Sequence, residues 1–411
     1  MLKNLELNII GLGYIGLPTA LIFANSGVKV VGTDYNEMLV NSLKEGRLTF
    51  EEEGLGELLN KAISNGIKFS TEYIKTDAYI IAVPTPYIKE NKKLDPQYVI
   101  SAVNSVLDVC VKGAIIIIES TISPGSIDKY IRPVISNRGL IIGQDIHLVH
   151  APERIIPGNM LYELKYNSRT LGVDNNSIGE QVKKLYSNFC DGEIVITDIR
   201  SAEMSKVVEN TYRDINIAFA NELAKICRID NMDVYEIIKT ANMHPRVNIL
   251  QPGPGVGGHC ISVDPWFLVG DYPDLTNLIL SARKINNSMP AYVLGRIRDV
   301  MKEHGIKDIS KIGLYGLAYK ENVDDTRESP TLQLLEKMED HLAFGVKVFD
   351  PFVKSRIIDH QFLDFEDFIN EIEIIVVMVA HDHIKENMKH IKDKLVIDTK
   401  NICHFKGVYK L

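Results

Sequence analysis

Short runs of β-branched residues alternate with amphipathic stretches over the first 200 residues. Five runs are expected to form strands, because each is apolar and ends in small or polar residues: 6–13, 28–34, 78–86, 114–120 and 146–153. Helical periodicity occupies the intervals between them. Strands that alternate with helices predict a parallel sheet with right-handed crossovers, whose ligands lie beyond the carboxyl ends of the strands. We therefore expect a doubly wound domain over residues 1–200.

The pattern changes near residue 200. Residues 201–229 contain no proline or glycine and carry Leu, Ile, Val and Ala at helical spacing, which predicts a helix of roughly 40 Å. A helix of this length can join two domains and serve as the spine of a dimer, although a surface helix without a special role is the alternative. We expect a central helical dimerisation region over residues 201–300.

The alternation of strands and helices returns after about residue 308. Apolar runs at 311–320, 346–351, 373–380 and 395–401 predict a second, smaller doubly wound sheet over residues 301–411. The expected fold class is therefore α/β, with two doubly wound Rossmann-like domains joined by a central long-helix region.

Composition narrows the classes of function. A net charge of −8 argues against nucleic acid or an anionic membrane surface as the partner. No run approaches 18 uninterrupted apolar residues, and the N-terminus lacks the features of a signal peptide. Five scattered cysteines fit neither a disulfide framework nor a zinc site. We therefore expect a cytoplasmic protein that holds no metal and is not attached to a membrane.

A glycine fingerprint, GLGYIG, follows the first expected strand and opens a helix. Its glycines allow a tight turn, close approach of a pyrophosphate and close packing of helix on strand. An aspartate ends the next strand, where its carboxylate can accept hydrogen bonds from ribose hydroxyls and would repel a 2′-phosphate. NAD is therefore expected rather than NADP, and a glycine turn without a nucleotide is the alternative. The expected NAD contacts here are Gly11, Gly13, Tyr14, Ile15, Gly16 and Asp34.

A related stretch, GLYGLAYK at 313–320, lacks the complete fingerprint. We also expect no acidic partner like Asp34 beside it. The second sheet is therefore expected to bind a ligand other than NAD.

The stretch GPGVGGHCISVDPW, residues 253–266, places four glycines before a single thiol, Cys260, with Asp264 shortly after it. A thiolate is a nucleophile, and glycine backbone leaves N–H groups open to an anion. Together with NAD, a nucleophilic thiol indicates aldehyde oxidation, because an aldehyde carbon gives up hydride to form an acid only after a nucleophile has added. The other cysteines are expected to be small buried hydrophobes: Cys110, Cys190, Cys227 and Cys403.

Seven motifs occur in an order that resembles the UDP-glucose/GDP-mannose dehydrogenase family over nearly the whole chain: GLGYIGLP, VPTP, ESTISPG, APER…PG, EMSKVVENTYR, GPGVGGHCISVDPW and GLAYKENVDDTRESP. The resemblance implies oxidation of the C6 alcohol of a nucleotide sugar to a carboxylate, with two NAD per turnover. It also implies an NAD-binding domain, a long-helix middle that builds a homodimer, and a nucleotide-binding α/β domain.

Within the family, GGHC followed by VDPW resembles the branch that acts on UDP-N-acetylhexosamines, whereas other branches carry GGSC followed by PKD. Together with HPR at 244–246, it favours UDP-N-acetyl-D-mannosamine as substrate, in surface polysaccharide biosynthesis such as that of a capsule. UDP-N-acetylglucosamine and UDP-glucose remain the alternatives. Ser262 stands where this branch often has proline, which bears on the stiffness of the loop.

The resemblance also implies roles for individual residues. The catalytic set is Cys260, Lys206, Asn210, Asp264, Thr121 and Glu153. Further cofactor contacts are Thr85, Ser120, Thr121 and Arg327. The substrate contacts are Glu153, Arg154, Lys206, Asn210, His244, Arg246, Gly257 and Lys320. Lys206 and Asn210 lie four apart on the expected helix and so share a face, where an ammonium and an amide could hold an oxyanion.

Other classes account for less of the sequence. A 6-phosphogluconate or 3-hydroxyacid dehydrogenase also joins a Rossmann domain to a long helix, and a sensor of the NAD/NADH ratio would need the fingerprint. Neither explains GGHC. The HDH stretch at 381–383 offers two histidines without a third ligand, and we expect a loop there rather than a metal site.

Overall fold

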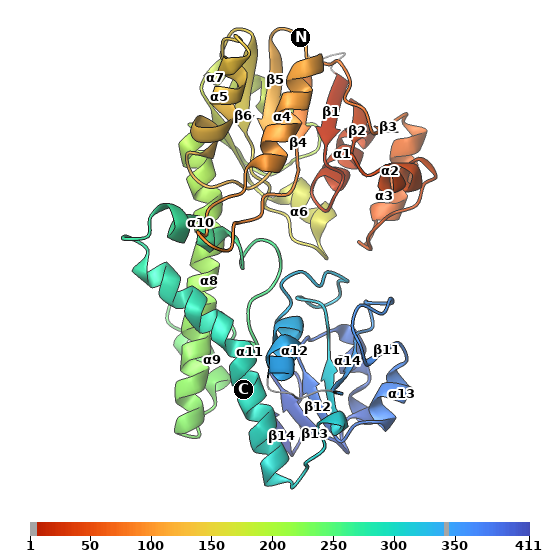
Figure 1. The fold of residues 1–411 in the computed structure, drawn as a ribbon, viewed down its shortest axis with the longest axis vertical. Coiled ribbons are helices and arrows are strands. Elements are labelled where there is room, and N and C mark those ends of the chain that lie inside the picture. The colour runs from red at the N-terminus through yellow and green to blue at the C-terminus, as the bar shows by residue number, and fades with distance from the viewer. Residues whose placement is uncertain (1–5, 341–344) are drawn as a thin grey trace. The chain divides into compact units, whose positions relative to one another are not determined.

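The computed structural model describes residues 6–340 and 345–411. The chain forms two compact units, residues 1–209 and 210–411, and the division falls within the long helix α8, Ile199–Ile229. The described residues form one sheet of eight strands and another of six. Figure 1 shows the strands and the helices of each unit. The expected α/β fold class with two doubly wound sheets is confirmed.

The N-terminal unit is built on the larger sheet, in the order β3-β2-β1-β4-β5-β6-β7-β8. Neighbouring strands in this sheet are parallel, except that β6 and β7 run antiparallel to each other. The order reverses between β1 and β4, and this reversal creates the crevice in which such sheets bind ligands. The strands are β1 Glu6–Ile10, β2 Lys29–Thr33, β3 Lys68–Ser70, β4 Ala78–Ile81, β5 Ala114–Ile118, β6 Ile146–His150, β7 Arg169–Val173 and β8 Ile194–Thr197.

All five strands expected in this unit are present, each shorter than its apolar run. The small and polar residues at the end of each run lie beyond the strand, at the edge where ligands bind. Three strands were not expected: β3, β7 and β8. The helices are α1 Gly16–Asn25, α2 Glu37–Lys44, α3 Leu55–Ser64, α4 Gln97–Val109, α5 Arg132–Asn137, α6 Met160–Tyr166, α7 Asn176–Tyr186 and the first part of α8.

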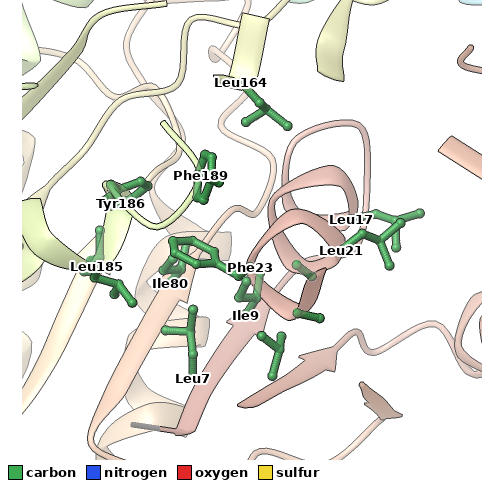
Figure 2. Packing of buried hydrophobic residues seen from close by; sticks show 14 of the residues in the cluster. Leu7, Ile9, Leu17, Leu21, Phe23, Ile80, Leu164, Leu185, Tyr186 and Phe189 are labelled. Atoms are coloured by element: carbon green, nitrogen blue, oxygen red, sulfur yellow. The ribbon is translucent and has the colours of Figure 1, made fainter. Parts of the chain in front are cut away.

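The core of this unit lies between β1 and the helices on one side of the sheet. Figure 2 shows Phe23 of α1 directed toward apolar side chains of β4 and α7, whereas Leu17 and Leu21 lie on the opposite side of α1. Phe23 of α1 is fully buried, and its ring meets that of Phe189 edge-on at 4.8 Å between centroids. Burial of one such side chain contributes about 1.5–3 kcal/mol, so this core holds the glycine turn of α1 against the sheet.

The C-terminal unit contains the rest of α8, a group of helices and the smaller sheet, in the parallel order β11-β10-β9-β12-β13-β14. The helix expected over 201–229 is confirmed within α8, whereas the 27-residue helix α11 was not expected. Its further elements are α9 Val234–Ala241, α10 Asp264–Asp271, α11 Asn277–Glu303, β9 Ile312–Tyr315, α12 Pro330–Asp340, β10 Lys347–Phe349, β11 Gln361–Phe362, α13 Phe365–Asn370, β12 Ile374–Val377, α14 Asp382–Glu386, β13 Leu395–Asp398 and β14 Val408–Lys410.

The described part of the chain contains no helix that is both long enough and apolar enough to cross a membrane.

Candidate functional site

The glycine turn joins β1 to α1 at the reversal of the strand order. Gly11 has a φ of +88°, and a Cβ on it would lie 2.5 Å from the carbonyl oxygen of Ala82. A Cβ on Gly16 would lie 1.8 Å from the carbonyl oxygen of Gly11. Both positions therefore require glycine for the turn itself, and the turn exposes the free N–H groups at the start of α1 to an anion.

Gly13 differs from its neighbours, because a Cβ added to it would meet nothing within 4 Å. The protein itself does not require glycine there, but a pyrophosphate that approaches the backbone does. Asp34 lies beside the turn: its Oδ2 accepts a hydrogen bond from the Leu12 N–H at 2.8 Å. The Tyr14 ring stacks on Phe50 at 4.3 Å. Together these residues fit NAD: an open backbone cradle, a helix N-terminus and a carboxylate beside them.

This contrast leads to a test with two alanine variants. Gly13→Ala should leave the melting temperature within about 2 °C of the parent but raise the KM for NAD about tenfold or more, because the methyl group occupies only the cofactor's space. Gly16→Ala should lower the melting temperature, because the methyl group collides with backbone. Thermal unfolding and NAD titration separate the two. Equal loss of stability in both variants would contradict the assignment of Gly13.

Three expected cofactor contacts follow neighbouring strands of the same sheet. Thr85 lies in the segment after β4 and is buried, and Ser120 and Thr121 follow β5. The Ser120 hydroxyl donates to the carbonyl oxygen of Val83 at 2.7 Å, which ties the two segments together. The carboxyl ends of β4 and β5 thus bring these side chains to the edge that carries the glycine turn.

A buried ionic cluster lies at the same edge of the sheet. Glu119 directly follows β5, Glu153 follows β6, and Arg169 opens β7 between them. Arg169 Nη2 lies 2.6 Å from Glu153 Oε2, and Nη1 lies 3.6 Å from Glu119 Oε1. Each side chain is at most 5% exposed. Of the three, only Glu153 was expected at the site; nothing in the local sequence marks Arg169, because its position depends on strand pairing.

The cluster holds one more carboxyl group than cations. Burial, reinforced by the charge of Glu153, raises the pKa of Glu119 to about 8 despite Arg169 and the hydroxyl of Tyr186, which donates to it. In the unfolded chain this carboxyl ionises near its ordinary pKa of 4.5. Between these values the folded state binds more protons, so this group lowers stability as pH rises from about 4.5 to about 8.

Glu119→Gln is therefore expected to remove part of the pH dependence of stability. Glutamine resembles the protonated acid, so the variant and the parent should melt at similar temperatures at pH 5. At pH 8.5 the variant should melt about 5 °C or more above the parent. Thermal unfolding across this range tests the expectation, and two curves that stay parallel at all pH values would contradict it.

Two further expected residues belong to the same unit as this cluster. They are Arg154, which follows Glu153 in the sequence, and Lys206. Arg154 donates from Nη2 to Glu209 of α8 at 2.5 Å and from Nη1 to the carbonyl oxygen of Ser168. Lys206 of α8 is buried, with 6% of its surface exposed. A lysine is rarely buried to this extent without a function or a partner, which keeps Lys206 a strong candidate.

The thiol loop belongs to the C-terminal unit. Cys260 is exposed, whereas Cys190, Cys227 and Cys403 are buried, as expected. Cys110, also expected to be buried, is half-buried. Asp264 opens α10 only four residues later, is 2% exposed, and donates its backbone N–H to the Cys260 carbonyl oxygen at 2.9 Å. Asn210 of α8 donates from Nδ2 to Asp264 Oδ2 at 2.6 Å. The structure therefore brings three expected catalytic residues to one place.

Side chains of α8 and α11 hold the irregular segment that leads to the thiol. Asn216 accepts from the Leu250 N–H at 2.9 Å, and Asn221 accepts from the Gly253 N–H at 2.8 Å. Behind them Arg283 of α11 pairs with Asp214 of α8 at 2.6 Å and reaches the Ile261 carbonyl oxygen at 3.4 Å. Backbone without regular structure needs such partners when it is buried, and here they fix the loop.

Two of the glycines before the thiol have a packing role that the sequence does not predict. A Cβ on Gly257 would lie 2.5 Å from the Glu328 carbonyl oxygen, and one on Gly258 would lie 2.8 Å from the Tyr319 ring. The Gly258 N–H donates to the carbonyl oxygen of Arg327 at 2.9 Å. These glycines therefore let the loop pack closely against residues 319–330, and the Gly258 N–H is not open to an anion.

The remaining expected residues lie on loops of the C-terminal unit. Arg327 is bound by both carboxylate oxygens of Asp325, and its side chain remains 44% exposed. Burial and Arg327 lower the pKa of His259, so the imidazole next to the thiol is neutral at pH 7. His244 and Arg246 are exposed after α9, and Lys320 is half-buried after β9.

The expectation that the second sheet lacks an acidic partner is wrong. Asp350 directly follows β10, as Asp34 directly follows β2, and its Oδ2 accepts from the Leu317 N–H at 2.6 Å. It was missed because the residue was read as part of the strand. Unlike half-buried Asp34, Asp350 is 3% exposed and also pairs with His381 at 3.2 Å. Its carboxylate is fully occupied by the protein.

The HDH stretch is not the expected loop throughout, because α14 begins at Asp382. The His383 Nδ1 atom lies 3.0 Å from the hydroxyl of Tyr315, and His381 accepts from the Asn322 N–H. Over residues 6–340 and 345–411, no three His, Cys, Asp or Glu side chains are grouped so as to hold a metal ion.

Comparison with known proteins places this geometry in context. Residues 5–190, 200–288 and 313–405 match the NAD binding, central and UDP binding domains of the UDP-glucose/GDP-mannose dehydrogenase family. UDP-N-acetyl-D-mannosamine dehydrogenase of Methanococcus vannielii is 45% identical, over 98% of this chain and 94% of its own length.

Two solved structures show the same fold. UDP-N-acetyl-mannosamine dehydrogenase of Staphylococcus aureus is 41% identical with a TM-score of 0.89, and UDP-D-ManNAc dehydrogenase of Pyrococcus horikoshii is 35% identical with a TM-score of 0.90. Each likeness covers 98% of both chains. The chain therefore belongs to the UDP-glucose/GDP-mannose dehydrogenase family of NAD-dependent nucleotide-sugar 6-dehydrogenases.

Proposed function

We propose that this enzyme oxidises the C6 alcohol of UDP-N-acetyl-D-mannosamine to the carboxylate, for surface polysaccharide biosynthesis. The observation that carries the proposal is the exposed Cys260 thiol beside buried, hydrogen-bonded Asp264. It is supported by the names of relatives that match this chain over nearly its full length. We assign residues 1–200 to NAD binding, 201–300 to dimerisation and the thiol loop, and 301–411 to the UDP-sugar.

The thiol allows one site to complete a four-electron oxidation. Bound NAD would accept one hydride in each of the two oxidations and would be held by the glycine turn and Asp34. Lys206, or a water activated by an aspartate, takes the proton of the C6 hydroxyl. Cys260 adds to the aldehyde carbon and forms a thiohemiacetal, whose oxidation gives a thioester. Asp264 orients the water that hydrolyses the thioester, and Thr121 and Glu153 support it.

The other contacts follow from charge and hydrogen-bonding capacity. Lys206 and Asn210 are suited to a developing oxyanion, since one supplies an ammonium group and the other an amide donor. We assign Thr85, Ser120 and Arg327 to the cofactor. Arg154, His244, Arg246, Gly257 and Lys320 are assigned to the nucleotide sugar.

The stoichiometry of NADH and a panel of sugars test this function. Two NADH per sugar should form from UDP-N-acetyl-D-mannosamine, at a kcat/KM above that for UDP-N-acetylglucosamine and UDP-glucose. One NADH per sugar would indicate a simple alcohol dehydrogenase. Faster oxidation of UDP-glucose would show that the branch was wrongly assigned.

We also propose that α8 forms a homodimer by contact with a second copy of the chain. Tyr212, Phe219 and Ile226 are spaced by seven residues, which is close to two helical turns, so they form one apolar stripe. They are 61%, 50% and 49% exposed, and a contiguous exposed apolar patch indicates an interface. Analytical ultracentrifugation should give a dimer that Phe219→Glu dissociates.

Five cysteines without a disulfide fit a reducing cytoplasm, where the reactive thiol is preserved.

A further inference from the structure

The direction of a single strand brings Arg169 to the candidate site. β7 pairs antiparallel with β6, with His150 opposite Gly172. If this register is continued for three residues, past the end of β6 and back to the start of β7, Glu153 lies opposite Arg169. This agrees with the 2.6 Å contact between them. In a parallel strand the first residue would lie at the opposite edge of the sheet. The reversal therefore delivers a guanidinium to the carboxyl ends of β5 and β6.

Arg169 is enclosed by two aromatic rings and two carboxyl groups. Its guanidinium lies 4.7 Å from the ring centroid of Tyr186 and 5.3 Å from that of Phe189. Its nitrogens face Glu153 and Glu119. Such a planar, forked cation can serve two carboxylates at once while it stacks on aromatic rings, which a lysine ammonium cannot do.

Glu153 is in turn held at both oxygens. Oε2 meets Arg169, and Oε1 accepts the backbone N–H of Arg154 at 2.6 Å. The side chain is 4% exposed, so without Arg169 it would be a carboxylate buried beside a second one. Arg169 and the Arg154 N–H together fix the orientation of Glu153.

We propose that Arg169 is a positioning residue for thioester hydrolysis, which it serves by holding the Glu153 carboxylate in place, with Glu119 as its second partner. The proposal rests on the function proposed above. In the hydrolysis, the water oxygen bonds to the thioester carbonyl carbon, the C–S bond breaks and Cys260 leaves as thiolate. The proton of the water passes to a carboxylate, and no electrons are exchanged with an oxidant.

The main test is Arg169→Lys, studied with UDP-N-acetyl-D-mannosamine and NAD. The kcat should fall about 10- to 100-fold, as expected when a group at the reacting centre is misplaced. Hydrolysis becomes rate-limiting, so a burst of NADH should precede slow turnover and intact-protein mass spectrometry should detect the acyl-enzyme. The KM for NAD should stay within about twofold. A merely structural role would lower the amount of active enzyme without accumulation of the acyl-enzyme.

A matched control is available in the same unit. Arg132 binds both oxygens of Asp174 at 2.7 and 2.8 Å but lies outside the candidate site. Arg132→Lys should retain the parent's kcat and show no burst. Full activity in Arg169→Lys, or a low kcat without acyl-enzyme, would overturn the proposal. A parent enzyme that forms no NADH from any UDP-sugar would instead overturn the proposed function.

If Arg169→Lys does not fold, the variant Glu119→Gln provides a second test of the role proposed for Arg169. Glu119 faces Glu153, Arg169, Tyr186 and the Thr19 hydroxyl, while Cys190 lies near Arg169. Once Glu119 ionises, it competes with Glu153 for Arg169. At pH 9 the parent should therefore accumulate more acyl-enzyme than at pH 7, and Glu119→Gln should not. Identical acyl-enzyme levels in the two proteins at pH 9 would contradict the role of the cluster.

Discussion

Replacement of Cys260 by alanine is expected to lower steady-state NADH formation on the order of 10⁴-fold or more, as when the nucleophile is removed from other covalent catalysts. The first oxidation needs no thiol, so at most one NADH per active site should form. The second cannot follow, because the aldehyde carbon has no bound nucleophile from which to release hydride. Stopped-flow absorbance at the NADH band measures both phases.

The remaining cysteines provide the control. Cys227 is buried in the C-terminal unit, and Cys227→Ala should retain activity within about twofold. Iodoacetamide should inactivate the parent by labelling Cys260, the exposed thiol of the five. A Cys260→Ala variant that still produced two NADH per sugar would show that the aldehyde is oxidised as its hydrate, without covalent capture.

The sequence predicts most of the fold because apolar runs and helical periodicity are local signals. The strands from β1 to β6, except β3, follow from such runs, and so does α8. β7 does not, since its residues RTLGV include an arginine and a glycine, and local pattern carries no information about strand direction. The importance of Arg169 therefore becomes visible only when the register of β6 and β7 is known.

The candidate site, like the fold, could be predicted from the sequence only in part. Motifs locate Cys260, Asp264 and Asn210 along the chain, but the bond between Asn210 and Asp264 depends on how α8 meets α10. Glycines at 257 and 258 are conspicuous in the sequence beside the thiol. Their neighbours, Tyr319 and Glu328, lie some 60 to 70 residues away in sequence, so their packing role could not be deduced. The spacing of residues along the sequence identifies the chemistry of the site, whereas tertiary packing determines which residues each of them contacts.

Loss of the buried ion pair behind the thiol loop is expected to have the largest effect on stability. Asp214 and Arg283 are 0% and 3% exposed, and they meet at 2.6 Å. Burial raises the pKa of Asp214 in spite of the nearby charge of Arg283. Asp214→Ala should lower the free energy of unfolding by about 3–5 kcal/mol, because it leaves an arginine buried without its counter-charge. Urea denaturation measures this change.

A surface pair and a double variant separate charge from packing. Lys165 and Asp191 lie 3.7 Å apart and are 49% and 62% exposed, so Asp191→Ala should cost less than about 1 kcal/mol. The double variant Asp214→Leu with Arg283→Met removes both buried charges together and should be nearly as stable as the parent. It should nevertheless have a lower kcat, because the Ile261 carbonyl oxygen loses its contact with Arg283 at 3.4 Å. A double variant with full stability and full activity would mean that the pair does not position the thiol.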